Sequence, residues 1–91
     1  MKALIADDDS DNREILVRML AHAGWEAEAV GGGGEAVVRA LSGGYDAALL
    51  DLAMPGVDGF EAARRIRAGG SRIALVAVSG AEAEEDRKSG V

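Results

Sequence analysis

The pattern of hydrophobic and polar residues predicts four short β-strands that alternate with helices. Three apolar runs are short enough to be buried strands, and one further segment alternates apolar with acidic residues, as a half-exposed strand does. In chain order, the strand segments cover residues 2–6, 25–30, 46–50 and 72–78. Apolar residues at helical spacing, each series soon followed by glycine, predict helices at residues 11–23, 35–41 and 60–68. A fourth helix can begin within residues 81–88.

The same pattern indicates where helices start and which side chains they bury. Asp11 is a candidate N-cap for the first helix, with Glu14 three positions on, a variant of the capping box. We expect Gly31–Gly34 to form a turn before the second helix. Inward-facing side chains are predicted on all three helices, at Ile15, Leu16, Met19, Leu20, Ala36, Val37, Ala40, Leu41, Phe60, Ala63 and Ile66.

Uninterrupted alternation of strand and helix is typical of the α/β class, in which helices cover both faces of a doubly wound parallel sheet. Ninety-one residues suffice for one domain, which we place at residues 1–91. Hydrophobic residues make up 48% of the chain but aromatic residues only 3%. The core is therefore predicted to pack mainly small side chains between sheet and helices.

Composition narrows the classes of function. The chain has no cysteine, which excludes disulfides and thiolate metal sites and suits a reducing compartment. No apolar run approaches the roughly 18 residues that span a bilayer, and no signal-peptide pattern opens the chain. We therefore expect a cytoplasmic protein with no membrane partner. The net charge of −6 argues against direct binding of nucleic acid, whose phosphates attract Lys and Arg.

Polar side chains stand at the ends of three predicted strands. Asp7 and Asp8 follow the first strand, Asp51 the third and Ser79 the fourth. In a parallel α/β sheet, ligands bind beyond the carboxyl ends of the strands, so two or three carboxylates should converge there. Mg²⁺ suits such a site, since it binds one or two carboxylates together with waters and phosphate oxygens. A carboxylate beside the metal can attack a phosphoryl group and form an aspartyl phosphate.

Simpler interpretations exist for some of these residues. Asp7–Asp9 alone could equally be a loop that caps the first helix, but the polar residues at the other strand ends favour a shared site. His22 is the only histidine, and it falls within the first helix, far from the strand ends. It offers no catalytic dyad.

Four stretches of the chain resemble the receiver domains of bacterial response regulators and hybrid histidine kinases. They are L-I-A-D-D-D at 4–9, D-N-R-E-I-L at 11–16, Y-D-A-A-L-L-D-L-A-M-P-G-V-D-G-F-E-A at 45–62 and I-A-L-V-A-V-S-G at 73–80. The resemblance covers essentially the whole chain, and D-x-x-M-P-x-x-D-G is its most specific part. It implies a flavodoxin-like, three-layer α/β/α fold with strand order 2-1-3-4.

The resemblance also implies a role for each residue of the site. Asp51 would accept a phosphoryl group from a phosphohistidine on a histidine kinase or a histidine phosphotransfer protein. Asp8 would bind Mg²⁺ directly and Asp7 through water, with Asp51 and the backbone carbonyl of Ala53 also at the metal. Ser79 would turn its hydroxyl toward the phosphoryl group. Phosphorylation would then switch a protein-interaction surface within a two-component phosphorelay.

The chain departs from the family pattern at its C-terminal end. Family members usually continue into a fifth strand, whose end carries a lysine, and then into a last helix. We find no counterpart of these segments in the sequence. A missing fifth strand would leave an apolar sheet edge exposed. We therefore expect a C-terminally incomplete receiver domain, with coverage of that edge by another chain as the alternative.

The resemblance implies a signalling domain and not an enzyme, with slow self-dephosphorylation as its only catalysis. A phosphatase that uses an aspartyl nucleophile would need a second Asp two residues after Asp51, where this chain has Ala53. The alternative function is a non-phosphorylated docking or dimerisation module. The sequence names no downstream partner, and it leaves a homodimer open.

Overall fold

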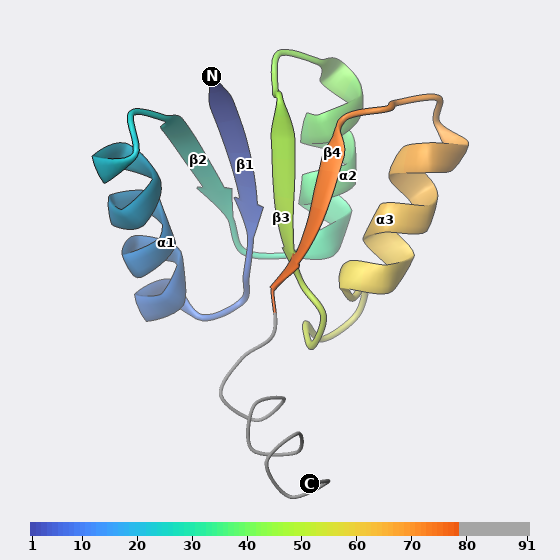
Figure 1. Ribbon diagram of the computed structural model, residues 1–91. Helices are drawn as coiled ribbons and strands as arrows, with labels where there is room; N and C mark the ends of the chain where they lie inside the picture. Colours follow the sequence, from blue (N-terminus) through green and yellow to red (C-terminus); the bar gives the residue numbers. More distant parts are fainter. Residues whose placement is uncertain (79–91) are drawn as a thin grey trace, which may run out of the picture.

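Four parallel strands form one sheet in the computed structural model, which describes residues 1–78 (Figure 1). The strands are β1 (Lys2–Ala6), β2 (Glu26–Val30), β3 (Ala47–Asp51) and β4 (Ala74–Val78). Their order in the sheet is β2-β1-β3-β4, which confirms the predicted α/β class and strand order. The register aligns the carboxyl ends, because Ala6 at the end of β1 pairs with Val30 of β2 and with Leu50 of β3.

Three helices connect the strands and cover the two faces of the sheet. They are α1 (Ser10–His22), α2 (Gly33–Ser42) and α3 (Gly59–Ala68). The helices α2 and α3 pack against each other on one face of the sheet, whereas α1 packs mainly on β1 and β2 (Figure 1). Helices on both faces are the arrangement expected of a doubly wound sheet.

The main core lies between the sheet and the pair α2 and α3. Its side chains are mostly small, as the composition predicts, and they are Leu4, Ala6, Val30, Ala36, Ala40, Ala48, Leu50, Met54, Ala62 and Ile66. The strand β1 lies in the middle of this packing and is buried from Ala3 to Ala6. A central strand covered on both faces is uniformly apolar for this reason.

Four side chains that we expected to face inward are exposed. Ile15 and Met19 of α1 are 54% and 62% exposed, Leu41 of α2 is 42% exposed, and Phe60 of α3 is 68% exposed. The prediction was wrong there because helical spacing marks an apolar stripe but not how much of it a neighbour covers. Only part of the predicted stripe packs inward, with Leu16 and Leu20 half-buried and Ile66 fully buried.

The helix starts differ from the prediction in two places. Asp9, and not Asp11, caps α1: its carboxylate accepts hydrogen bonds from the backbone N–H groups of Asp11, at 2.8 Å, and Asn12, at 3.4 Å. The helix therefore begins directly after the loop that leaves β1. The predicted turn at Gly31–Gly34 ends early, because α2 already begins at Gly33.

The remaining differences are small. The strand β3 includes Asp51, one residue beyond the predicted end, and β4 begins at Ala74, two residues later than predicted. The expected helix at residues 81–88 and the side chain of Ser79 lie outside the described residues. None of the helices within residues 1–78 has the length and apolar character that crossing a membrane requires.

Candidate metal-binding site

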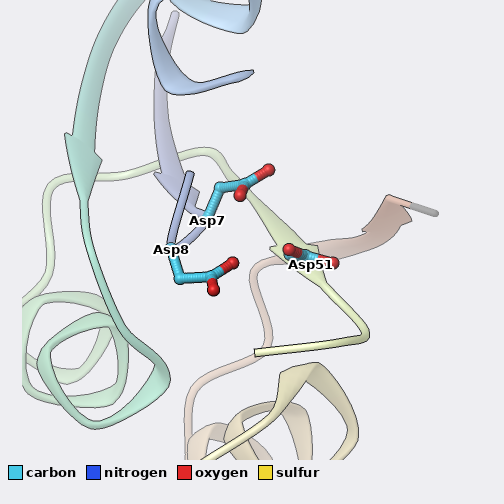
Figure 2. Close-up of side chains that lie close together, drawn as sticks. All are labelled: Asp7, Asp8 and Asp51. Carbon is cyan, nitrogen blue, oxygen red and sulfur yellow. The ribbon is translucent and has the colours of Figure 1, made fainter. Parts of the chain in front are cut away.

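Three carboxylates meet at the carboxyl edge of the sheet. Asp7 and Asp8 follow β1 directly, and Asp51 is the last residue of β3. Because β1 and β3 are adjacent and in register, their ends deliver the three side chains to one place, as Figure 2 shows. One carboxylate oxygen from each lies within 4.8 Å of the others. The predicted convergence of acids at the strand ends is confirmed for these residues.

Asp7 is the most deeply placed member of the cluster. It is only 3% exposed and is the one buried charged side chain among residues 1–78. Its Oδ1 accepts a hydrogen bond from the N–H of Asp9 at 2.9 Å, and its own N–H donates to the carbonyl of Val30 at 3.2 Å. Burial raises the pKa of the Asp7 carboxyl, and the nearby negative charge of Asp51 raises it further. The loop therefore holds a carboxylate where its charge is costly without a cation.

Asp51 and Asp8 lie nearer the surface. Asp51 is half-buried, and its Oδ1 accepts a hydrogen bond from the N–H of Ala53 at 3.0 Å. This bond closes a local turn of the kind that Asp side chains favour, and it orients the carboxylate at the start of the following loop. Asp8 is exposed, so it is open to a ligand arriving from solvent.

The loop after Asp51 is packed tightly against the site. Met54 is buried in the core and anchors the loop, and Asp58 caps α3 by accepting a hydrogen bond from the N–H of Glu61 at 2.8 Å. Gly59 begins α3 so close to Asp51 that an added Cβ would lie 2.4 Å from the Asp51 carbonyl oxygen. This approach requires glycine at the start of α3.

Arg13 is a polar neighbour of the site that the sequence analysis missed. Its Nη1 donates a hydrogen bond to the backbone carbonyl oxygen of Asp7 at 2.8 Å. A signal for it exists in the sequence, because a cation on the first turn of a helix that directly follows strand-end acids can reach back to them. The direction of the Arg13 side chain depends on where α1 begins. Because the sequence pattern did not place that start at Ser10, it could not show that Arg13 points back toward Asp7.

The donor set fits a hard divalent cation. Carboxylates held this close repel one another, and oxygen ligands of this kind suit Mg²⁺ or Ca²⁺. Asp7, Asp8 and Asp51 are therefore a group that can hold a metal ion. Ser79, predicted to complete the site, lies outside the described residues, although it directly follows Val78, which pairs with Asp51 across β3 and β4.

The fold and the acidic cluster define a class of domain, a flavodoxin-like α/β domain with a candidate metal site at the carboxyl edge of its sheet. Residues 3–91 match the family model described as the response regulator receiver domain. The chain therefore belongs to the response regulator receiver domain family, which serves two-component signalling. The resemblance noted in the sequence is confirmed.

A response regulator with a similar sequence agrees with this assignment. The response regulator MprA of Mycobacterium avium is 33% identical over 91 residues, which make up 100% of this chain and 40% of MprA. This chain thus spans less than half the length of that relative. The activity and partners of a longer protein do not follow from the match.

Two solved structures superpose closely on the chain and contain magnesium. The response regulator TrrA of Thermotoga maritima, in complex with Mg²⁺ and BeF, is 31% identical with a TM-score of 0.82, covering 98% of this chain and 78% of TrrA. The receiver domain of the sensor histidine kinase PA1611 of Pseudomonas aeruginosa has magnesium coordinated in its active-site cleft. It is 32% identical with a TM-score of 0.81, covering 96% of this chain and 73% of that one.

Proposed function

We propose that this receiver domain accepts a phosphoryl group on Asp51 in a Mg²⁺-dependent reaction. The observation that carries the proposal is the meeting of Asp7, Asp8 and Asp51 within 4.8 Å at the carboxyl edge of the sheet. The magnesium in TrrA and in the PA1611 receiver domain supports the same metal here. The donor is a phosphohistidine on a histidine kinase or a histidine phosphotransfer protein.

In the proposed transfer, a carboxylate oxygen of Asp51 forms a bond to phosphorus while the bond from phosphorus to the donor imidazole nitrogen breaks. The bonding electron pair stays on that nitrogen. The donor side chain takes up a proton and ends as a neutral histidine. One oxygen of Asp51 is already held by the N–H of Ala53, which leaves the other free to attack. Bound Mg²⁺ would neutralise charge on the phosphoryl oxygens.

The proposed ligands of the metal are Asp8 directly, Asp7 through water, Asp51 itself and the backbone carbonyl of Ala53. The exposure of Asp8 suits direct binding, and the burial of Asp7 suits a supporting role, because the buried carboxylate is the less accessible of the two. The only reaction that the domain would catalyse by itself is the slow hydrolysis of its aspartyl phosphate. Its place is therefore that of a phosphoacceptor in a phosphorelay, and not of an enzyme.

The output of phosphorylation is proposed to be a change of surface around the end of β4. Val78, the last residue of β4, pairs with Asp51, and Ser79 is the next residue in the sequence. A hydroxyl there that turns toward the phosphoryl group would transmit the new charge to β4 and to the surface beside it. This is a population shift between two states, driven by a local charge. We place the receiver domain at residues 1–91.

The test is the intact mass of the protein after incubation with acetyl phosphate, with and without Mg²⁺. We expect the gain of one phosphoryl group that requires Mg²⁺ and disappears in Asp51→Asn. The matched control is Asp11→Asn, which removes an equal charge from an exposed position on α1 outside the cluster. Equal uptake by Asp51→Asn and the parent would exclude Asp51 as the acceptor. No uptake by a folded parent would favour a non-phosphorylated docking or dimerisation module.

A further inference from the structure

Arg13 closes a ring of contacts around the loop between β1 and α1. The Asp7 carboxylate accepts from the N–H of Asp9 at 2.9 Å, and the carbonyl of Asp9 accepts from the N–H of Arg13 at 3.0 Å. The Arg13 side chain then turns back and donates from Nη1 to the carbonyl of Asp7 at 2.8 Å. Each of the three residues thus restrains the next, and Arg13 provides the link that returns to Asp7.

The same side chain also lies against the turn that leaves β2. A Cβ added at Gly31 would be 3.5 Å from Nη1 of Arg13, so the guanidinium lies beside that turn. The N–H of Asp7 donates to the carbonyl of Val30, immediately before Gly31. The backbone of Asp7 is therefore held at its N–H by Val30 of β2 and at its carbonyl by Arg13.

We infer that Arg13 is a positioning residue that sets the Mg²⁺ affinity of the acidic cluster by holding the Asp7 backbone, and with it Asp8, in place against Asp51. This inference rests on the proposed metal site. Groups that hold metal ligands through hydrogen bonds affect affinity strongly, because an unrestrained ligand must be ordered each time the metal binds. Arginine suits this task better than lysine, since its planar fork is pre-organised for directed hydrogen bonds.

The sign of the effect separates positioning from simple electrostatics. Arg13 carries a positive charge that contacts the Asp7 backbone carbonyl beside the acidic cluster, so removing that charge makes the surroundings of the site more negative and should tighten Mg²⁺ binding by Coulomb attraction alone. Loss of the bond to the Asp7 carbonyl should weaken binding instead. A weaker affinity in Arg13→Gln can therefore come only from lost positioning.

The experiment measures the Mg²⁺ dissociation constant of the full chain from amide chemical shifts in an NMR titration with Mg²⁺. We expect Arg13→Gln to raise the dissociation constant about tenfold, and Arg13→Lys, which keeps the charge, to raise it by less. The matched control is Arg18→Gln on the same helix. Arg18 is exposed and pairs with Glu14 at 2.6 Å, so this variant makes the same charge change away from the loop. It should stay within about twofold of the parent.

Each outcome decides the matter. A dissociation constant in Arg13→Gln that equals or falls below that of the parent overturns the inference. If Arg13→Gln does not fold, Arg13→Lys decides, because unchanged affinity in that variant overturns it equally. The rate of phosphoryl uptake from acetyl phosphate should also be measured for Arg13→Gln at low and at high Mg²⁺. High Mg²⁺ should restore this rate, because it offsets a weaker affinity. A defect in folding would not respond to the metal.

The failures of this inference and of the proposed function differ. If the parent binds Mg²⁺ and takes up phosphoryl but Arg13→Gln behaves like the parent, only the role of Arg13 is lost. If the parent binds Mg²⁺ and Arg13→Gln binds it more weakly, but neither takes up phosphoryl, Arg13 keeps its role and the proposed function is lost. A folded parent that binds no Mg²⁺ overturns both.

Discussion

The close approach of Gly59 to Asp51 allows a prediction whose magnitude follows from the structure. In Gly59→Ala, the new methyl group would lie 2.4 Å from the carbonyl oxygen of Asp51, 2.9 Å from its carbonyl carbon and 3.1 Å from Cα of Leu52. All three are backbone atoms, so no flexible side chain can move aside. The start of α3 or the end of β3 must shift by roughly half an ångström or more, which is overpacking of a buried site.

Overpacking of this kind costs about 1–3 kcal/mol. Replacing a helical glycine by alanine returns at most about 1 kcal/mol through helix propensity, and less at the first position of a helix. We therefore expect Gly59→Ala to lower the free energy of unfolding by about 1–2 kcal/mol. For a domain of this size, that corresponds to a melting temperature lower by about 4–16 °C.

The assay is urea unfolding followed by the fluorescence of Trp25, the only tryptophan. Gly34→Ala is the matched control, because Gly34 lies in α2 with nothing within 4 Å of an added Cβ. It should stabilise the protein by about 0.5–1 kcal/mol, since only the propensity gain applies.

The reasoning would be refuted if Gly59→Ala proved as stable as the parent while Gly34→Ala behaved as expected. Because the displaced atoms belong to Asp51, a folded Gly59→Ala should also take up phosphoryl more slowly. If Gly59→Ala were less stable but took up phosphoryl at the normal rate, the added methyl group would have displaced the start of α3 and left Asp51 in place.

Three further predictions concern Asp7, two isoleucines and one tyrosine. Burial raises the pKa of Asp7 in the folded protein, so without metal the free energy of unfolding should fall as the pH rises from the pKa of the unfolded state through that of the folded state. Asp7→Asn should therefore be more stable than the parent at neutral pH in EDTA. Parallel pH profiles of the two proteins in urea unfolding would contradict this. Ile66→Ala should lower the free energy of unfolding by about 2–5 kcal/mol because Ile66 is fully buried, whereas Ile15→Ala, at an exposed position, should change it by less than about 0.5 kcal/mol. The Tyr45 hydroxyl donates a hydrogen bond to Glu28, and this bond is the largest cause that lowers the pKa of Glu28. Tyr45→Phe should raise that pKa in an NMR titration and weaken the stabilisation that Glu28 provides above the pKa of its unfolded state. An unchanged pKa would exclude the bond.

Much of the fold and the three acidic residues of the site could be predicted, because they depend on the local pattern of apolar and acidic residues. Apolar runs that end in acids marked β1 and β3 within a residue of their observed ends. Placing Asp7, Asp8 and Asp51 together needed only the rule that parallel strands share one carboxyl edge. The exposure of Ile15, Met19 and Phe60 was missed, because helical spacing does not say how far a neighbouring element extends over the stripe.

Taken alone, the sequence determined the class of fold, the strand ends and the acids that meet there, since these follow from side-chain type and short-range periodicity. Only the tertiary structure decided which acid caps α1, because Asp9 and Asp11 would each start the helix at a different residue and the path of the chain leaving β1 selects Asp9. It also decided that Gly59 lies against the Asp51 carbonyl and that Arg13 reaches the Asp7 carbonyl. Both contacts join a strand end to the start of the helix that follows it, so they depend on how each helix packs relative to its strand, which the pattern of apolar and polar residues does not specify.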